Sequence, residues 1–320
     1  MTVKLGIVMD PLESIKPKKD STLAMMYAAQ KRGWKLFEIQ QQGIFITQDK
    51  VFAECREIRV YTDESDWFSV LGTTTIPLTD LDLVLLRKDP PFDMEYIYTT
   101  YLLELAEQKG LTVINKPASV RDCNEKLYAL QFPECCPPYV VSRDDRILRD
   151  FYKEHQDVVF KPLWGMGGAS IFRVTPGDKN LGVIIETLTE HGQHQAMAQR
   201  FIPEISSGDT RILIINGEPV PYGLARIPAA DENRGNLAAG GEGVGRELTE
   251  RDRFICNQIG PSLVAKELFF VGIDVIGDYL TEINVTCPTC IRELDRAFDL
   301  DIAGDYMNFI DQTFLGDGRN

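Results

Sequence analysis

Short apolar runs and longer stretches of helix-like composition follow one another along the first third of the chain. Val3–Met9 and Leu81–Arg87 are compact apolar runs of the kind that form buried strands. Asp20–Lys31 and Asp93–Lys109 have the lengths and the following glycines that are typical of helices. Strands that alternate with helices predict a mostly parallel sheet with helices on both faces. We therefore expect residues 1–122 to form an α/β domain.

The rest of the chain has a pattern dominated by hairpins. Asn216-Gly217 is a strong signal for a two-residue turn, and it lies between the strand-like runs Arg211–Ile215 and Pro219–Arg226. A second hairpin is predicted from Phe269–Ile276 and Leu280–Val285. This half of the chain is therefore expected to be an antiparallel, α+β domain.

The composition narrows the range of partners. The chain has 320 residues, of which 48 are acidic and 34 are basic, giving a net charge of −14. A surface this acidic repels phosphate backbones and anionic lipids, so we expect no nucleic acid and no membrane among the partners. No apolar run approaches the roughly 20 residues that a membrane helix needs. The seven cysteines are scattered and do not resemble a disulfide framework, so a soluble, cytoplasmic protein is expected.

Several common catalytic motifs are missing from the sequence. There is no G-x-S-x-G, which disfavours a hydrolase nucleophile elbow, and there is no P-loop motif. No G-x-G-x-x-G follows the first predicted strand, and the three histidines disfavour a histidine-rich metal site. If this chain binds nucleotides, it must do so through a site that uses neither of these glycine-rich motifs.

Lys161 stands at the end of a predicted strand and precedes a glycine-rich turn. The segment Lys161–Ser170 (KPLWGMGGAS) contains three glycines within four residues. Glycine lets backbone N–H groups approach an anion closely, and lysine supplies the point charge that a phosphate needs. The same pattern also suits an ordinary hairpin loop with positive φ angles. On its own, this segment therefore leaves both a phosphate site and a plain turn open.

Asp274, Glu282 and Asn284 form a second candidate site. Glu282 and Asn284 are two residues apart on a predicted strand, so their side chains leave the same face. Asp274 joins that face only if the hairpin turn has an odd length, for example three residues with a bulge. Two carboxylates and an amide oxygen suit Mg²⁺ shared with phosphates better than zinc. The alternative is a solvated sheet face, but the segment is otherwise apolar, and burying unpaired carboxylates is costly.

Arginines form the third set of candidate residues. A guanidinium group binds carboxylates and phosphates bidentately, although most single arginines are surface residues. The glycine-containing stretch 235–241 beside Arg234 suggests a closing lid, and Ala238–Gly245 is predicted to be a mobile loop. The C-x-x-C of Cys287–Cys290 has no second pair, which disfavours zinc or redox chemistry there. The candidate arginines are Arg211, Arg226, Arg234, Arg246 and Arg292.

Six segments together carry a resemblance to a known family. They are Leu5–Pro11, Arg87–Asp93, Asn115–Leu127, Lys161–Val174, Arg226–Gly241 and Thr281–Arg292. The ordered combination of KDPPFD, RGNLAAGG and TEINVT is far more specific than any one of these motifs. From Val3 to about Phe314, the chain resembles bacterial glutathione synthetases of the ATP-grasp superfamily.

The resemblance implies a fold and an activity. The fold would be an N-terminal pre-ATP-grasp domain, residues 1–122, followed by a two-lobed ATP-grasp domain, residues 123–316, with lobes at 123–201 and 202–316. The activity would be the ATP-dependent joining of γ-glutamylcysteine to glycine through an acyl phosphate, giving glutathione, ADP and phosphate. The family uses Mg²⁺ or Mn²⁺, and its bacterial members are often tetramers, so a homo-oligomer is expected.

The resemblance also implies a role for each matching residue. Arg211 would lie at the transferred phosphoryl group, and Arg234 would belong to the lid that excludes water, so both would be catalytic. The metal ligands would be Asp274, Glu282 and Asn284. The substrate-binding residues would be Arg87, Arg226, Arg234 and Arg292. The ATP-binding residues would be Lys126, Lys161, Gly165, Met166, Gly167, Gly168, Gln199, Arg200, Phe201, Ile202, Arg211 and Asn236.

Two positions depart from the family pattern. Trp164 stands where an acidic residue is usual, and Cys287 stands where serine is more common. Neither position belongs to the expected metal or phosphoryl-transfer residues, so activity remains the expectation. The nearest rival is another ATP-grasp carboxylate–amine ligase, such as one that adds glutamate or joins D-alanines. A rival of a different class is a nucleotide-binding regulatory or scaffold protein that has lost turnover.

Overall fold

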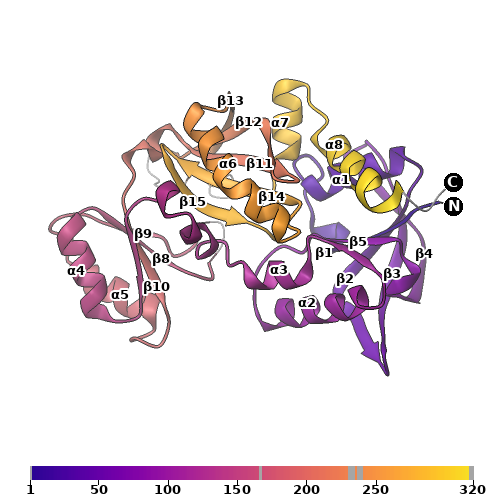
Figure 1. Cartoon of the computed structure of the whole chain (residues 1–320), viewed down its shortest axis with the longest axis horizontal. Coiled ribbons are helices and arrows are strands. Elements are labelled where there is room, and N and C mark those ends of the chain that lie inside the picture. The colour runs from indigo at the N-terminus through magenta and orange to yellow at the C-terminus, as the bar shows by residue number, and fades with distance from the viewer. Residues whose placement is uncertain (1, 166–167, 230–234, 236–240, 317–320) are drawn as a thin grey trace.

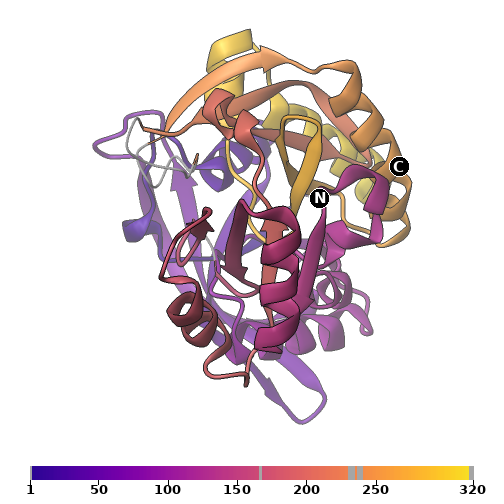
Figure 2. The same cartoon turned by 90° about the vertical axis from the view of Figure 1, so that its left-hand side faces the viewer.

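Three sheets follow one another along the long axis of the molecule (Figure 1). A computed structural model describes residues 2–165, 168–229, 235 and 241–316 of the chain. The first sheet lies at one end, the second at the other, and the third between them. Figure 2 faces the end that carries the second sheet.

The first sheet contains the N-terminal strands in the order β4-β3-β2-β1-β5-β6. Its members β2, β1, β5 and β6 are parallel, and β3 and β4 add antiparallel strands at one edge. The mostly parallel sheet is therefore confirmed, but β4 was not predicted, because this edge strand is largely exposed and its sequence lacks a regular alternation of apolar and polar residues. The strands are β1 Lys4–Met9, β2 Lys35–Thr47, β3 Lys50–Val60, β4 Phe68–Pro77, β5 Leu83–Leu86 and β6 Thr112–Ile114.

Helices cover both faces of the first sheet, as the alternation of strand side chains requires. In β1, Ile7 packs in a core shared with the helices α1 and α8, whereas Val8 packs in the core on the α2 side. The pairing of α8 with α1 brings the last helix of the chain back onto the N-terminal sheet (Figure 1). These helices are α1 Ser21–Lys31, α2 Met94–Glu107, α3 Pro117–Asp122 and α8 Ile302–Ile310.

The second and third sheets are antiparallel, which confirms the hairpin-rich pattern of this half of the chain. The second sheet has the order β7-β10-β8-β9 and the third β13-β12-β11-β14-β15. The second sheet and its helices are β7 Tyr139–Ser142, α4 Asp145–His155, β8 Val158–Pro162, β9 Phe172–Val174, α5 Leu181–Thr189 and β10 Ala196–Arg200. The third sheet and its helices are β11 Asp209–Ile215, β12 Glu218–Ile227, β13 Glu242–Glu247, α6 Glu250–Ala265, β14 Phe270–Ile276, β15 Tyr279–Asn284 and α7 Ile291–Phe298.

The prediction of a loop over Ala238–Gly245 is wrong for residues 242–245, which belong to β13. Residues 238–240 lie outside the described residues, but 242–245 pair with β12 as a regular strand. The glycine at Gly245 has a packing reason, because a Cβ there would lie 2.5 Å from the ring of Phe298. In the sequence alone, a glycine that allows a neighbouring side chain to pack closely looks the same as a loop glycine.

Asn115 joins the first sheet to the third. Its amide nitrogen donates to the carbonyls of Phe270 and Val285 at 2.8 and 3.0 Å. Its amide oxygen accepts from the backbone N–H groups of Phe269 and Phe270 at 2.8 and 3.0 Å. One buried side chain therefore satisfies four backbone groups across the contact between the sheets.

We expect Asn115→Ala to destabilise the protein strongly. The substitution leaves two buried N–H groups and two carbonyls without this partner, so the free energy of unfolding should fall by roughly 3–5 kcal/mol. Urea unfolding followed by circular dichroism measures the change. The control is Asn180→Ala, because Asn180 is exposed and its side chain bonds locally to Asp178. An equal, small effect of both substitutions would contradict the assignment.

Candidate active site

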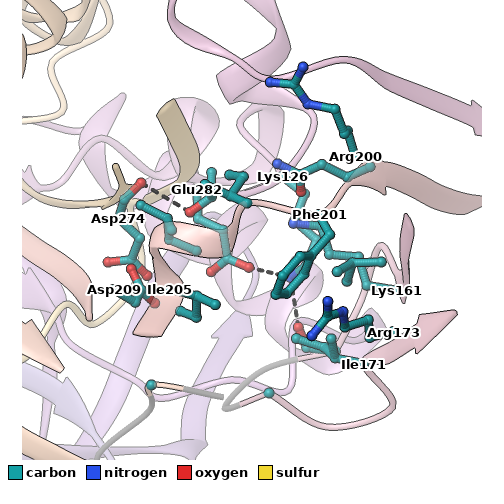
Figure 3. A pocket seen from close by; sticks show the side chains of 18 of the residues that line it. Lys126, Lys161, Ile171, Arg173, Arg200, Phe201, Ile205, Asp209, Asp274 and Glu282 are labelled. Atoms are coloured by element: carbon teal, nitrogen blue, oxygen red, sulfur yellow. Dashed lines mark hydrogen bonds and ion pairs between the residues drawn. The ribbon is translucent and has the colours of Figure 1, made fainter. Parts of the chain in front are cut away.

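A cleft opens between the second and third sheets. It measures about 1050 Å³, counted with the open solvent at its mouth. Residues from both sheets and from the segment before the second sheet point into it (Figure 3). Eight residues expected to bind ATP line this cleft: Lys126, Lys161, Gly165, Gly168, Gln199, Arg200, Phe201 and Ile202.

One part of the cleft has the flat, apolar character that suits a planar ring. Phe201 follows β10, and the guanidinium of Arg173 stacks on its ring at 3.5 Å from the centroid (Figure 3). Asp157 holds that guanidinium in place through an ion pair at 2.7 Å. Ile171 and Ile205 also line the cleft here. Arg173 was not predicted as a site residue, because its contact with Phe201 joins two segments that only the folded chain brings together.

Two lysines supply positive charge in the cleft. Lys161 is the penultimate residue of β8, is buried, and makes no ion pair with any residue in the described part of the chain. Burial lowers the pKa of its ammonium group, and the charge of Lys126 adds to this effect while Glu282 opposes it. A buried cation without a protein partner is costly, and it suits a site that receives an anion.

Lys126 connects three parts of the site. Its ammonium group donates to the Glu125 carboxylate at 2.6 Å and to the carbonyl of Gly165 at 2.8 Å, and it lies 3.3 Å from Glu282. Burial lowers the pKa of this group, but Glu282 and Glu125 outweigh the burial, so the pKa is raised. Lys126 is therefore charged, and it ties the start of the glycine-rich turn to the carboxylates of the third sheet.

The hairpin of β14 and β15 brings the three predicted metal ligands to one face. Asp274 pairs with Glu282 and Gly272 with Asn284, while a bulge shifts the register between Asp274 and Val275. This is the bulge that the sequence required for a common face. The amide nitrogen of Asn284 donates to the Asp274 carboxylate at 3.3 Å, so its oxygen remains available to a cation.

Asp274 is held by two buried arginines. Arg211 donates to both of its oxygens at 2.5 and 3.0 Å, and Arg226 lies 2.9 Å away. Burial raises the pKa of this carboxyl, but the two guanidinium groups outweigh the burial and hold the pKa well below its usual value. Arg226 also pairs with Asp209 at 2.6 Å. The result is a compact, ionised cluster beneath the cleft.

Asp209 and Glu125 belong to this site although the sequence analysis did not single them out. Burial raises the pKa of Asp209 to about 7, and its Oδ1 has no hydrogen-bond partner among the described residues. The predicted strand began at Arg211, whereas β11 begins at Asp209, so Asp209 lies two positions before Arg211 on the same strand and shares its face. Glu125 accepts a hydrogen bond from its immediate neighbour Lys126, but only the folded chain brings it to the wall of a cavity.

A second hollow, about 1460 Å³ when the open solvent at its mouth is included, meets the cleft at Asp274 and Glu282. Arg211 and Arg226 line this hollow together with Asn284. Its other walls come from the N-terminal part of the chain and from the turn Cys287–Cys290. A molecule in the hollow can therefore reach the end of a nucleotide in the cleft at this pair of carboxylates.

Arg87 and Arg292 line neither the cleft nor the hollow. Arg87 is buried and donates to Thr22 Oγ1 and to the carbonyl of Pro288, at 3.2 and 2.8 Å. Arg292 donates to the carbonyl of Pro17 at 2.7 Å, next to the Tyr27 ring. Each arginine fixes a wall of the hollow in this structure. The expected residues Met166, Gly167, Arg234 and Asn236 lie outside the described residues, whereas Gly235 lines the cleft.

The remaining candidates take up structural positions. Arg246 pairs with Asp252 at 2.6 Å and lines neither the cleft nor the hollow. Trp164 is 63% exposed. Cys287 and Cys290 line the hollow, but burial raises the pKa of both thiols, which disfavours the thiolate that redox chemistry needs.

Comparison with known proteins decides the family. The model of the prokaryotic glutathione synthetase N-terminal domain matches residues 3–121, and that of the prokaryotic glutathione synthetase ATP-grasp domain matches residues 125–299. The chain belongs to the prokaryotic glutathione synthetase family. It is therefore an ATP-grasp ligase of the class that forms C–N bonds.

Curated relatives agree over nearly the whole length. A glutathione synthetase of Pseudomonas aeruginosa is 58% identical over 310 residues, covering 97% of this chain and 98% of the relative. One of Escherichia coli O157:H7 is 53% identical over 309 residues, covering 97% and 98%. Membership of this family confirms the predicted ligase class and the predicted use of ATP.

Solved structures of lower identity share the fold. D-cycloserine synthetase has a TM-score of 0.69 at 14% identity, covering 97% of this chain and 99% of that one. The ATP-grasp ligase PsnB, complexed with a precursor peptide and AMPPNP, has a TM-score of 0.61 at 16% identity, with 97% of both chains covered. These likenesses confirm the ATP-grasp fold. Within the described residues, no helix is both long and apolar enough to span a membrane.

We expect Lys161→Met to separate stability from nucleotide binding. Methionine fills a similar volume without a buried charge, so the free energy of unfolding of the ligand-free protein should rise by about 1–2 kcal/mol. Affinity for an unhydrolysable ATP analogue should fall at least about tenfold, because a charge-assisted contact is lost. Chemical unfolding and titration calorimetry measure the two effects.

The exposed Lys179 of the same lobe provides the control variant Lys179→Met, which should change neither quantity. A less stable ligand-free Lys161→Met protein that binds the analogue normally would contradict the role given to Lys161.

Proposed function

We propose that this chain joins γ-glutamylcysteine to glycine at the expense of ATP, through an acyl phosphate, and releases glutathione, ADP and phosphate. The observation that carries the proposal is the meeting of the cleft and the hollow at Asp274 and Glu282. A nucleotide in one cavity and a carboxylate substrate in the other would face each other there. The names of the curated relatives support glutathione as the product.

The residues at this junction suit phosphoryl transfer to a carboxylate. Such a transfer needs positioning and charge neutralisation and no protein nucleophile. Lys126 and Lys161 would bind the phosphates, Arg211 would lie at the transferred group, and Arg226 would hold the acceptor carboxylate. The amine of glycine would then attack the acyl phosphate and displace phosphate. We propose that Arg234 belongs to the lid that keeps water from the intermediate, as water would hydrolyse it.

The donor set fits a divalent cation of the hard type. Glu282 and the amide oxygen of Asn284 are oxygen donors, and Asp274 lies beside them as a fixed negative charge. Glu282 is held by Lys126 alone among the described residues, so its carboxylate can also serve a metal ion. We propose Mg²⁺, or Mn²⁺ in its place, which when bound would neutralise the charge of the phosphates.

We also propose domain boundaries, an oligomeric state and a cellular location for this chain. We propose a substrate-binding domain at 1–122 and ATP-grasp lobes at 123–201 and 202–316, which the separate sheets support. The packing of α8 on α1 shows that the end of the last lobe also covers the first sheet. We further propose a homo-oligomer, a tetramer as in bacterial members of the family, in the cytoplasm.

ADP release with Mg-ATP and γ-glutamylcysteine, with and without glycine, tests the proposed function. We expect glycine to stimulate ADP release, with one glutathione formed per ADP as followed by mass spectrometry. Glu282→Gln should lower this rate about 100-fold or more, because it removes the charge shared by the metal and Lys126. Glu134→Gln changes an exposed glutamate outside both cavities and should leave the rate unchanged.

Two results would refute the proposal. Nucleotide binding without ADP release under these conditions would favour the regulatory protein. ADP release that depends on D-alanine and yields a D-alanine dipeptide would favour the rival ligase.

A further inference from the structure

The outer face of α2 is apolar, whereas the face of a surface helix that points away from the core is normally polar or charged. Five residues of α2 are exposed, and among them only Glu95 carries a charge. In α4, by contrast, five of the six exposed residues are charged. The other exposed residues of α2 are Met94, Tyr98, Tyr101 and Leu105, with between 40% and 53% of each side chain exposed. A contiguous apolar surface of this kind indicates a site of interaction with a partner.

These four side chains form one stripe along the helix, called the α2 stripe below. Successive members are four, three and four residues apart, which is the spacing of the seam between paired helices. The helix lies on the outside of the first sheet, away from the second sheet (Figure 1). None of the four residues lines the cleft or the hollow. A partner on the α2 stripe would therefore leave both cavities open.

Tyr101 is held in place before any partner binds. The guanidinium of Arg121 lies over its ring at 4.1 Å from the centroid. That guanidinium is itself fixed, because it donates to Glu104 at 2.7 Å and to Thr100 at 3.2 Å. Tyrosine and arginine are among the residue types that carry most of the binding energy of protein interfaces. A preordered pair of this kind loses little side-chain entropy when a partner binds.

The hairpin of β2 and β3 extends the apolar surface beyond the end of α2. Ile46 of this hairpin is 43% exposed and pairs with Val51, which belongs to the core beneath α2. Lys109, just after α2, forms an ion pair at 3.6 Å with Asp49 at the tip of the same hairpin. Ile46 therefore lies on the same side of the sheet as the α2 stripe and continues it.

The area of this surface suits a contact between two folded chains. Large apolar side chains bury roughly 150–250 Å² each, so four that are about half exposed leave roughly 400 Å² of apolar surface on one copy. A stable interface buries about 800 Å² on each partner, with an apolar core and a polar rim. The α2 stripe and Ile46 would supply the core of such an interface.

The spacing of the α2 stripe points to a second copy of this chain as the partner. The intervals of four, three and four residues read the same from either end. A twofold axis between Tyr98 and Tyr101 therefore brings Tyr98 of one copy onto Tyr101 of the other, and Met94 onto Leu105. This meets the condition for a contact in which both partners use the same surface. The scarcity of charge on the stripe also lets two chains of net charge −14 approach each other there.

We infer that two copies of this chain pair through α2, antiparallel, about a twofold axis between Tyr98 and Tyr101. The inference rests on the homo-oligomer proposed above and names the surface that forms it, but it does not depend on the proposed reaction. Under this symmetry Met94 contacts Leu105 at two places, once from each copy. One substitution in the chain therefore changes the contact twice.

Opposite charges at the two ends of the α2 stripe test the contact in the full-length protein. Leu105→Glu should raise the dissociation constant of the assembly at least about 100-fold and so halve its mass on dilution, because an unpaired charge is buried at two places. Met94→Lys should have the same effect. The double variant Met94→Lys/Leu105→Glu should recover at least about tenfold of this loss, since the opposite charges meet across the axis. Within one helix the two positions are about 16 Å apart, too far to pair.

Analytical ultracentrifugation over a range of protein concentrations measures the mass and the dissociation constant. Val183→Glu is the matched control, because Val183 of α5 is 57% exposed and lies outside the apolar surface of α2. This variant should leave both quantities unchanged. Recovery in the double variant would show that neither single variant lost its assembly by misfolding.

Three results would overturn the inference. An unsubstituted protein that is monomeric would refute it together with the proposed homo-oligomer, while the proposed reaction would stand. An assembly that withstands both single substitutions would show that another surface joins the copies. Dissociation of both single variants without recovery in the double variant would refute the antiparallel pairing about this axis.

Discussion

The ion cluster of Asp274, Arg211 and Arg226 is the constraint on which the site depends. Three charged side chains are buried where the third sheet faces both cavities, and Asp209 completes the cluster. Removing one member of such a cluster leaves an uncompensated charge in a buried place, which is strongly destabilising. The cluster therefore keeps two guanidinium groups and a carboxylate in fixed positions before any ligand arrives. Preorganised charge of this kind stabilises developing charge without the cost of rearrangement.

The position of the hollow depends in turn on how the first sheet is attached to the third. Asn115 satisfies four backbone groups at this contact, and Arg87 crosses it from β5 to the carbonyl of Pro288. Arg292 and Arg296 of α7 hold the segment before α1 against α7. Because these contacts link chain segments far apart in sequence, the walls of the hollow form only when the whole chain is folded. Arg87 and Arg292 thus hold the walls in place without lining the hollow themselves.

Much of the nucleotide side could be predicted because its information is local. Lys161 with its glycines, and Glu282 with Asn284, are recognisable from strand ends, turns and the alternation of side chains along a strand. The bulge that brings Asp274 to the same face was stated as a condition, and the register meets it. The glycines of β13 misled the analysis, because Gly245 serves the close approach of Phe298 and no loop. The edge strand β4 contains apolar and β-branched residues but no regular alternation of apolar and polar positions, since none of its side chains is buried.

By itself, the sequence determined the alternation of strands and helices in the first domain, the two kinds of sheet, and the residue types that we propose for phosphate and metal binding. These features follow from periodicity and from neighbours along the chain, which a sequence displays directly. The tertiary structure alone decided that Arg87 and Arg292 bind carbonyl groups and that Arg173 stacks on Phe201. The use made of a charged side chain depends on which distant atoms lie within about 3 Å of it, and only the folded packing fixes that distance.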